Sequence, residues 1–252
     1  MAKRHLFCKQ NRPQFPTKGR LSKRKPLFTM RMRRKKHGAE RIAACSELLI
    51  TEYEKLKAEP QFSFPKEAAL CLEIGCGKGD FACGTAENNP EINLIAMERV
   101  ADVACLALEK AKSRADGRTD NLRFIIGDAK NIPEWFPEHS IDTIYLNFSD
   151  PWPKEGYKKR RLTHRGFLEM YRSALKENGY LRLKTDNKGL FDFSLEEFEA
   201  CGLIVEWFTY DLHNSEYAEG NVMTEYERNF TAKGFPICSA LVKFPAKKEE
   251  TV

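Results

Sequence analysis

Short apolar runs alternate along this chain with stretches in which apolar residues recur at helical spacing. The apolar runs are typical of buried strands, and they cover residues 69–75, 93–99, 122–128, 141–148 and 180–186. Helices are predicted between them: one after Gly79, one ending near residue 114, one over 164–177 closed by Asn178-Gly179, and one over 190–201. Two later runs, 203–212 and 237–244, predict the last strands.

This alternation predicts the fold class. When a strand, a helix and another strand repeat in this order, the strands are mostly parallel, because each connection must cross over one face of the sheet. The sequence therefore predicts an α/β fold built on a doubly wound, mostly parallel sheet with helices on both faces.

The N-terminal part of the chain has a different pattern. Residues 1–39 contain Pro13, Pro16 and Pro26 and show no apolar periodicity, which is typical of a flexible arm. One amphipathic helix on the flank of the domain is then predicted, because apolar side chains recur every three or four positions at Ile42, Cys45, Leu49, Tyr53 and Leu56. The predicted division is an arm over 1–40 and a folded domain over 41–252, with a short linker at 60–65.

Charge is distributed unevenly between these two parts. The net charge is +6, but residues 1–39 hold 14 Lys and Arg and no acid, whereas the remaining residues hold 28 Lys and Arg against 36 Asp and Glu. A basic arm on a mildly acidic domain favours binding to a polyanion such as nucleic acid. A solubilising tail or an organelle transit peptide would have the same composition.

Several classes of protein are disfavoured by the composition. The chain has no run of 18 apolar residues to span a membrane and no apolar signal-peptide core near its start. Its eight cysteines form no C-x-x-C pair, and its five histidines lack ligand spacing, so no metal site is expected. Thiols inside apolar runs suit a reducing compartment, and we expect the cytoplasm.

A glycine-rich turn follows the first predicted strand, in the order Glu73, Gly75, Gly77 and Gly79. This order matches neither the G-x-G-x-x-G of dinucleotide-binding proteins nor the P-loop. Glycines at a turn between a strand and a helix let a ligand approach the backbone closely, although a plain tight turn would look the same.

Two acids at the ends of the next strands strengthen the case for a ligand. Glu98 ends the second strand and can accept both hydroxyls of a ribose, and Asp128 ends the third and can accept from an adenine amino group. The ends of neighbouring parallel strands meet in one crevice, so these acids are expected to bind adenosine together. Glu73 suits a cationic amino-acid moiety, which favours S-adenosylmethionine over NAD. At this point the sequence resembles the class I methyltransferases.

A more specific resemblance lies after the fourth strand. The stretch Phe148-Ser149-Asp150-Pro151-Trp152-Pro153-Lys154, then Lys159-Arg160-Arg161-Leu162, Lys184-Thr185-Asp186-Asn187 and Thr224-Glu225-Tyr226-Glu227, resembles the tRNA (guanine-N7-)-methyltransferases over residues 69–245. The resemblance implies a Rossmann-like class I methyltransferase fold with seven strands, the last antiparallel. It also implies transfer of a methyl group from S-adenosylmethionine to a tRNA guanosine in the variable loop, at position 46. The chain departs from the family pattern at Glu155, Gly156 and Tyr157.

The chemistry explains an acid at Asp150. Guanine N7 has a free lone pair and attacks the sulfonium methyl without a strong base, so catalysis depends on alignment and on the placement of charge. A carboxylate that accepts from N1–H and the amino group holds guanine by its Watson–Crick edge and leaves N7 open. Asp150 is therefore the predicted catalytic residue, next to the cofactor. Trp152 would wall the pocket or, alternatively, anchor the core.

The other segments are expected to contact the substrate. Lys154 and Asp186 are predicted to bind the target nucleotide, together with Thr224, Glu225, Tyr226 and Glu227. On sequence alone a helix start with a capping box explains the last four better, and the resemblance reverses that preference. The basic cluster Lys158, Lys159, Arg160 and Arg161, together with the arm, is expected to hold the RNA backbone around a guanosine extracted into the pocket.

Two alternatives remain open at this point. One is a class I methyltransferase acting on another RNA or on a protein, and the other is an RNA-binding scaffold without activity. The basic arm and cluster disfavour the protein substrate, and the full set of strand-end acids disfavours the inert scaffold. The expected partner is tRNA, without membrane or metal, and the enzyme could be a monomer or a homodimer.

Overall fold

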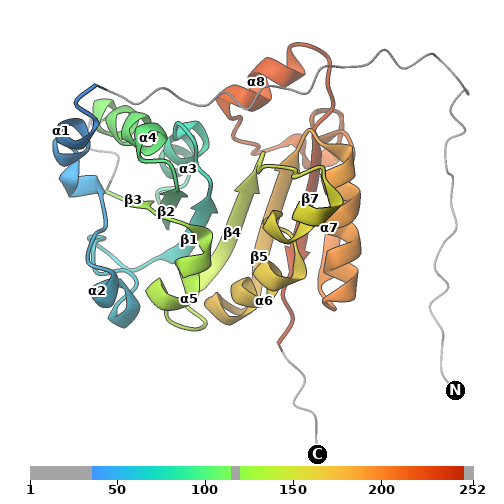
Figure 1. Ribbon diagram of the computed structural model, residues 1–252, viewed down its shortest axis with the longest axis horizontal. Helices are drawn as coiled ribbons and strands as arrows, with labels where there is room; N and C mark the ends of the chain where they lie inside the picture. The colour runs from blue at the N-terminus through green and yellow to red at the C-terminus, as the bar shows by residue number, and fades with distance from the viewer. Residues whose placement is uncertain (1–35, 115–119, 247–252) are drawn as a thin grey trace, which may run out of the picture. The chain divides into compact units, whose positions relative to one another are not determined.

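The computed structural model describes residues 36–114 and 120–246, which form a seven-stranded sheet covered by helices (Figure 1). The strand order is β3-β2-β1-β4-β5-β7-β6. The strands are β1 (Ala69–Ile74), β2 (Ile92–Glu98), β3 (Leu122–Ile126), β4 (Ile141–Asn147), β5 (Leu175–Thr185), β6 (Ile204–Thr209) and β7 (Cys238–Lys243). All neighbours pair in parallel except β7, which is antiparallel to both β5 and β6. The predicted fold class is confirmed.

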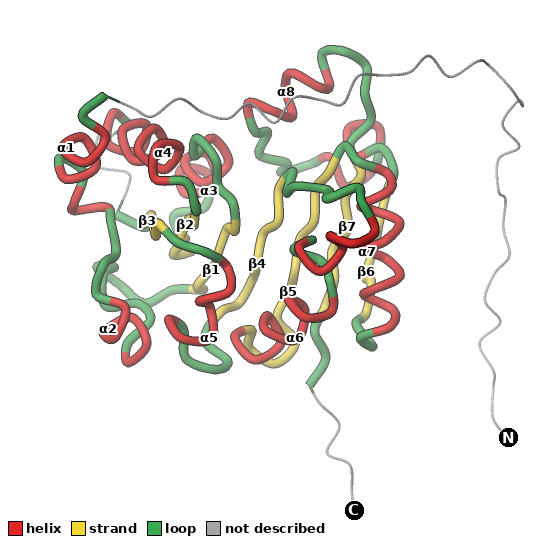
Figure 2. Tube along the Cα trace, in the orientation of Figure 1, coloured by secondary structure: helices red, strands yellow, loops and turns green. Residues whose placement is uncertain are grey.

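Helices cover both faces of this sheet, as the trace in Figure 2 shows. The α-helices are α1 (Gly38–Ala43), α2 (Tyr53–Ala58), α3 (Asp80–Asn88), α4 (Ala101–Ser113), α5 (Ile132–Trp135), α6 (Arg165–Ala174), α7 (Lys188–Ala200) and α8 (Glu225–Thr231). The 3₁₀ helices are η1 (Ser46–Leu48), η2 (Ala129–Asn131), η3 (Glu155–Arg160), η4 (Leu212–Asn214) and η5 (Glu216–Ala218). None of the helices in the described residues is long and apolar enough to cross a membrane.

The strands separate two apolar cores because successive side chains point to opposite faces. In β1, Leu70, Leu72 and Ile74 belong to one core, whereas Cys71 belongs to the other. β2 divides in the same way, with Ile95 and Met97 on one face and Leu94 and Ala96 on the other. A strand buried on both faces needs a continuous apolar run, which is the pattern that the sequence shows.

The single amphipathic helix predicted from Ile42 to Leu56 is wrong. The segment instead forms α1, η1 and α2, with an extended piece between them. Leu49 pairs with Phe124, and the Ile50 amide donates to the Phe124 carbonyl at 2.9 Å. Because β3 is an edge strand with unpaired backbone groups, covering that edge competes with continuing the helix.

The predicted end of the helix over 164–177 is also wrong. The helix α6 ends at Ala174, and β5 begins immediately with Leu175, which pairs with Ile141. Asn178 has a positive φ of 62°, so the Asn-Gly pair bends β5 rather than closing a helix. The register between β4 and β5 shifts at this bend.

The predicted boundary at residues 40 and 41 falls inside α1. Arg41 donates from Nε to Oε1 of Glu109 on α4 at 2.6 Å, which attaches α1 to the domain. Most of the predicted arm lies outside the described residues.

Candidate functional site

A cavity of about 550 Å³ opens at the carboxyl ends of β1, β2, β3 and β4. The strand order reverses between β1 and β4, which is where ligands bind in doubly wound sheets. Of the predicted site residues, the cavity is lined by Gly75, Glu98, Asp128, Asp150, Lys159 and Arg160. The structure thus brings three carboxylates and two cations to one place.

The glycine-rich turn has two kinds of glycine. Gly75 and Gly77 have φ of 82° and 57°, and a Cβ built on either would meet no atom within 4 Å. Both positions therefore need the left-handed conformation and leave open space for a ligand. Gly79, with φ 78°, is needed for packing, because its Cβ would lie 2.9 Å from Cβ of Ala107 on α4.

Backbone amides fix the Glu98 carboxylate. Its Oε2 accepts from the Gly77 amide at 3.1 Å and its Oε1 from the Val100 amide at 2.9 Å. Each oxygen keeps a second lone pair, so the carboxylate can still accept ribose hydroxyls. Asp128 is held similarly, since its Oδ1 accepts from the Lys130 amide at 3.0 Å, and its Oδ2 lies 3.8 Å from Arg99.

Glu73 is a buried carboxyl group with one unused oxygen. Oε1 accepts from Asn147 Nδ2 at 2.9 Å, whereas none of the described residues donates to Oε2. Burial raises the pKa of Glu73 to about 7, against the opposing effect of the Asn147 hydrogen bond. An unpaired buried oxygen is costly, so this atom fits a cationic ligand such as an amino-acid ammonium.

Ser149 lines the cavity and Asn147 contacts Glu73, and neither was predicted from the sequence as a site residue. Both flank Phe148, and both carry a buried oxygen without a hydrogen-bond partner among the described residues: Oδ1 of Asn147 and Oγ of Ser149. Together with Oε2 of Glu73, they give three buried acceptors on β1 and at the end of β4. Asn147 is a polar residue at the end of an apolar strand, and this feature of the sequence could have indicated it as a candidate.

The loop after β4 is strained at two aromatic residues. Phe148 has φ 54° and Trp152 has φ 41°, both unusual for residues with a side chain. The Phe148 amide donates to the Lys184 carbonyl at 2.8 Å. Asp150 is exposed between the two aromatic residues and lines the cavity. Trp152 also lines the cavity and is half-buried, which supports its interpretation as a pocket wall rather than a core anchor.

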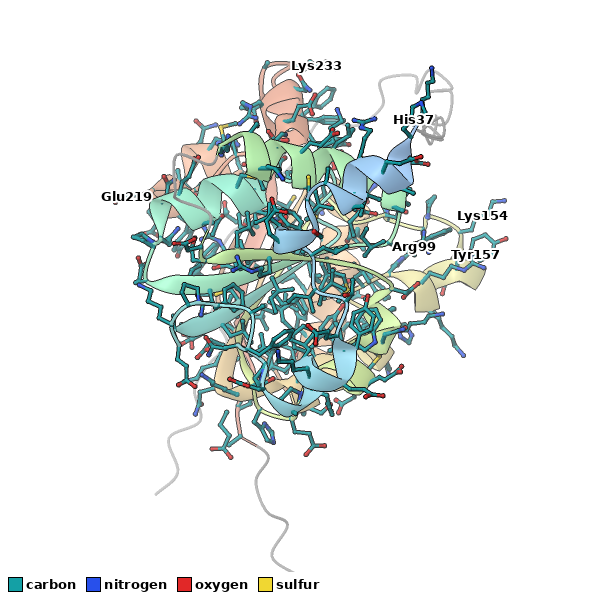
Figure 3. The ribbon with its side chains drawn as sticks, turned by 90° about the vertical axis from the view of Figure 1, so that its left-hand side faces the viewer. His37, Arg99, Lys154, Tyr157, Glu219 and Lys233 are labelled. Carbon is teal, nitrogen blue, oxygen red and sulfur yellow. The ribbon has the colours of Figure 1, made fainter. Side chains whose placement is uncertain are left out.

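The four residues of the predicted RNA-binding cluster differ in their exposure to solvent. Lys158, Lys159 and Arg160 are exposed, and Lys158 pairs with Glu155 at 2.6 Å. Arg160 lies over Trp152, 4.9 Å from the ring centroid, and Arg161 is half-buried. Lys154 and Tyr157 project from this loop on the same side of the molecule as Arg99 (Figure 3).

The segment 224–227 lies apart from the cavity lining and starts α8. Thr224 caps the helix, and Glu227 completes a capping box. The alternative interpretation of this segment as a capped helix start is therefore correct in the structure. Glu227 is fully buried and accepts from Lys184 Nζ at 2.8 Å. The Lys184 ammonium also donates to Asn221 Oδ1 and to the Val222 carbonyl. Lys184 therefore attaches the segment before α8 to β5.

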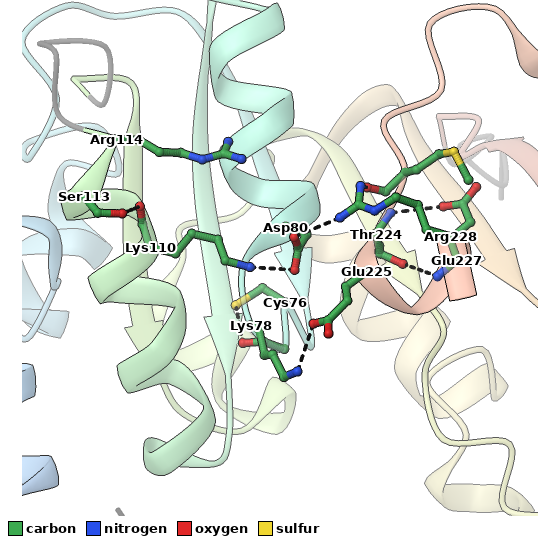
Figure 4. A network of polar contacts seen from close by, with 12 residues as sticks. Cys76, Lys78, Asp80, Lys110, Ser113, Arg114, Thr224, Glu225, Glu227 and Arg228 are labelled. Atoms are coloured by element: carbon green, nitrogen blue, oxygen red, sulfur yellow. Dashed lines mark hydrogen bonds and ion pairs between the residues drawn. The ribbon is translucent and has the colours of Figure 1, made fainter. Parts of the chain in front are cut away.

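Ion pairs also connect α8 to the glycine-rich turn (Figure 4). Lys78 lies 2.9 Å from Glu225, and Asp80 contacts both Arg228 at 3.1 Å and Lys110 at 2.7 Å. The predicted substrate residues 224–227 and the predicted cofactor turn are thus held side by side.

Asp186 and Tyr226 form the remaining predicted pair. The Tyr226 hydroxyl donates to Asp186 Oδ2 at 3.4 Å. Partial burial raises the pKa of Asp186, and burial with the neighbouring Asp186 charge raises that of Tyr226, so the tyrosine stays a hydrogen-bond donor at neutral pH. The Tyr226 ring lies 5.1 Å from Phe148, which lines the cavity.

Comparison with known sequences finds a family and close relatives. Residues 67–240 match the model of a family described as putative methyltransferase. The tRNA (guanine-N(7)-)-methyltransferase of Limosilactobacillus reuteri strain DSM 20016 is 45% identical over 215 residues, covering 85% of this chain and 100% of the relative. The enzyme of the same name from Geobacillus sp. strain WCH70 is 42% identical, covering 88% of this chain and 99% of the relative.

Comparison with solved structures supports the fold. An antibiotic-related methyltransferase aligns with a TM-score of 0.55 at 16% identity, covering 78% of this chain and 96% of that structure. The 16S rRNA methyltransferase KamB aligns with a TM-score of 0.55 at 13% identity, over 77% of this chain and 93% of that structure. At these identities the likeness concerns the fold alone.

Proposed function

This chain belongs to the tRNA (guanine-N7-)-methyltransferase family, and we propose that it transfers a methyl group from S-adenosylmethionine to N7 of a guanosine in tRNA. We further propose that the target is the variable-loop guanosine at position 46. The observation that carries the proposal is the convergence of Glu98, Asp128 and Asp150 with Gly75 on one cavity, within the region that matches the family.

Mass spectrometry of nucleosides tests this function. Unmodified tRNA transcript incubated with the protein and S-adenosylmethionine is expected to yield 7-methylguanosine. A transcript with adenosine at position 46 is expected to yield none, which tests the position separately. Methyl incorporation into protein or another RNA, without 7-methylguanosine in tRNA, would contradict the proposal and support the first alternative.

The residues around the cavity suit the cofactor. Glu98 would hold the ribose hydroxyls, Asp128 the adenine amino group, and Glu73 the ammonium, while Gly75 and Gly77 let the ligand approach the backbone. S-adenosylmethionine supplies an electrophilic methyl group on a sulfonium. Asp150 would keep the guanine oriented and offset the positive charge that develops on N7.

Glu98→Ala is expected to weaken S-adenosylmethionine binding about ten- to a hundredfold, since a hydrogen bond to a charged group contributes about 1.5–3 kcal/mol. Titration calorimetry measures the change. Glu138→Ala, an exposed glutamate before β4 at the opposite end of the sheet, is the matched control. Unchanged affinity of Glu98→Ala would remove this residue from the site.

Cofactor affinity is expected to depend on pH through Glu73, whose pKa is about 7. The carboxyl group must be ionised to pair with an ammonium, so affinity should be lost as pH falls through 7, by roughly tenfold between pH 8 and pH 6. Calorimetry in buffers of different ionisation enthalpy should also detect proton release on binding near pH 6.5. Glu73→Gln should abolish both effects, and an equal pH dependence in that variant would contradict the assignment.

The raised pKa of Glu73 has the opposite effect on the stability of the ligand-free protein. Because folding raises the pKa of Glu73, the folded state binds this proton more tightly than the unfolded state. The contribution of Glu73 to the free energy of unfolding is therefore favourable at low pH and is lost as pH rises toward 7.

Substrate contacts are proposed for residues outside the cofactor-binding set, of which Lys159 and Arg160 also line the cavity. Lys154 and Asp186 would contact the target nucleotide, and Lys158, Lys159 and Arg160 would bind phosphates, since all three are exposed. Thr224, Glu225, Tyr226 and Glu227 would act on the substrate from the start of α8, where Tyr226 is exposed beside Asp186. The buried thiols Cys71, Cys76 and Cys83 suit the cytoplasm, where we propose that the enzyme works as a monomer or homodimer.

The basic arm over residues 1–40, most of which lies outside the described residues, is proposed to hold the tRNA backbone. Deleting residues 1–35, which hold 13 Lys and Arg, is expected to weaken tRNA binding and to flatten its dependence on salt, because fewer counterions are released. Binding measured at several salt concentrations tests this, with cofactor affinity as the control. An unaltered salt dependence would leave the arm without a role in RNA binding.

A further inference from the structure

A row of aromatic rings leads outward from the cavity along α8. Starting at Phe148, the ring of Tyr226 lies at 5.1 Å, that of Phe230 stacks on Tyr226 at 4.3 Å, and that of Phe235 lies 5.7 Å from Phe230. Tyr226 is 39% exposed and Phe235 is 41% exposed. We call Tyr226, Phe230 and Phe235 the aromatic ladder.

The outer end of the ladder is held rigidly. The amide of Phe235 donates to the Phe230 carbonyl at 3.2 Å, and the amide of Gly234, with φ 75°, donates to the Thr231 carbonyl at 2.8 Å. This is the Schellman arrangement of a helix end, which normally brings the two flanking apolar side chains together. It explains why Phe235 packs on Phe230 but leaves much of the Phe235 ring open to solvent.

The helix that carries the ladder is also joined to the cofactor turn by ion pairs, and one cation lies beside the ladder. Lys78 and Arg228 connect α8 to the glycine-rich turn and to Asp80. Lys233 lies with Nζ 5.7 Å from the centroid of the Phe230 ring. Exposed aromatic side chains beside a cation suit unpaired bases on a phosphate backbone, because bases stack on aromatic side chains whatever their sequence.

We propose that the aromatic ladder is a stacking surface for the unpaired nucleotides next to the target guanosine. The inference rests on the proposed function, since it adds a second contact for the same tRNA. A guanosine extracted from its stack leaves its neighbours without a partner, and the ladder continues directly from Phe148 at the cavity. Stacking there would offset part of the free-energy cost of extraction.

Phe235→Ala tests this inference, because Phe235 lies at the exposed end of the ladder and outside the cavity lining. The variant is expected to bind unmodified tRNA transcript about five- to a hundredfold more weakly, with cofactor affinity unchanged. Phe208→Ala is the matched control, since Phe208 is 50% exposed on the edge strand β6, away from the ladder. Its tRNA affinity should equal that of the parent protein.

The outcomes separate the ladder from the proposed function. If the parent protein methylates the transcript and Phe235→Ala binds it normally, the ladder is not a tRNA contact. If Phe235→Ala instead alters the oligomeric state in sedimentation, the surface contacts another protein chain, which also overturns the inference. A parent protein that methylates no tRNA would overturn both proposals together.

A separate observation concerns Arg161, which is half-buried beside the exposed basic cluster. Its Nε donates to the Pro151 carbonyl at 3.1 Å and its Nη2 to the Trp152 carbonyl at 3.2 Å. The guanidinium also lies 4.3 Å from the centroid of the Phe193 ring on α7. These contacts use two nitrogens of the planar guanidinium, so the Arg161 side chain is directed toward the protein.

The geometry points to Arg161 as a positioning residue for Asp150 rather than a phosphate contact. It connects the loop containing Asp150 to α7 and supports Trp152, whose φ of 41° is unfavourable without such contacts. A lysine at this position would keep the charge but could not donate through the same fork or stack in the same way.

Arg161→Lys separates the two roles. If Arg161 is a positioning residue, replacing it with Lys should lower turnover at saturating tRNA at least tenfold. The affinity for tRNA, its salt dependence and the affinity for the cofactor should not change. Lys159→Gln is the comparison and should flatten the salt dependence by about one unit of slope. Normal turnover in Arg161→Lys, together with a flatter salt dependence in Arg161→Gln, would show that Arg161 contacts a phosphate.

Discussion

Replacing Asp150 with Asn is expected to slow methyl transfer at least tenfold, equivalent to about 1.4 kcal/mol in the barrier. The variant keeps the shape of the side chain and one acceptor oxygen, but it loses the negative charge that offsets the cation forming on N7. Asp150→Ala also loses the acceptor and should abolish most turnover. Asp150 is exposed in a loop after β4, so neither change should disturb the fold.

Single-turnover rates at saturating tRNA and cofactor isolate this step. Both ligands should bind the Asn variant nearly as they bind the parent protein, so that the loss appears in the rate and not in affinity. Glu138→Gln, at the opposite end of the sheet, controls for removing a surface charge. A rate for Asp150→Asn close to that of the parent protein would mean that the charge takes no part in catalysis.

Lys184→Met is expected to lower the free energy of unfolding by about 3–5 kcal/mol, because the buried Glu227 carboxylate keeps the Asn221 amide and His213, 3.1 Å away, but loses the buried ammonium beside it. Lys184 is 1% exposed and Glu227 is fully buried. The ammonium of Lys184 donates to three acceptors, and burial lowers its pKa while Glu227 opposes that shift. Loss of these contacts should also release the segment before α8 and reduce activity.

Chemical denaturation measures this effect, and the chain provides a matched control four residues away. Lys188 pairs with Asp192 at 2.6 Å on the surface of α7, where its side chain is 68% exposed. Lys188→Met should change stability by no more than about 0.5 kcal/mol. The double variant Lys184→Met with Glu227→Gln should recover part of the loss, and equal effects of the two single Lys variants would contradict the role of burial.

Much of the fold could be predicted from local pattern alone. A parallel strand buried on both faces needs an unbroken apolar run, so strands such as β1 and β2 are visible without any tertiary information. Since the carboxyl ends of such strands meet at one edge, the positions of Glu98 and Asp128 in sequence were sufficient to predict that they share a cavity, whereas Asp150 was expected there from the family resemblance.

Other features depend on partners far away in the sequence. The apolar spacing from Ile42 to Leu56 predicts a helix, but the exposed edge of β3 made an extended Leu49 more favourable. A lysine in a strand is expected at the surface, but Lys184 is buried with Glu227, 43 residues later, and with two further acceptors of the same segment. The sequence by itself was enough for the alternation of strands and helices, which follows from periodicity, and for Glu98 and Asp128, which stand where strands end. The contacts of Asn147, Arg161 and Lys184 follow only from the tertiary structure, because burial and hydrogen-bond partners arise when distant segments pack.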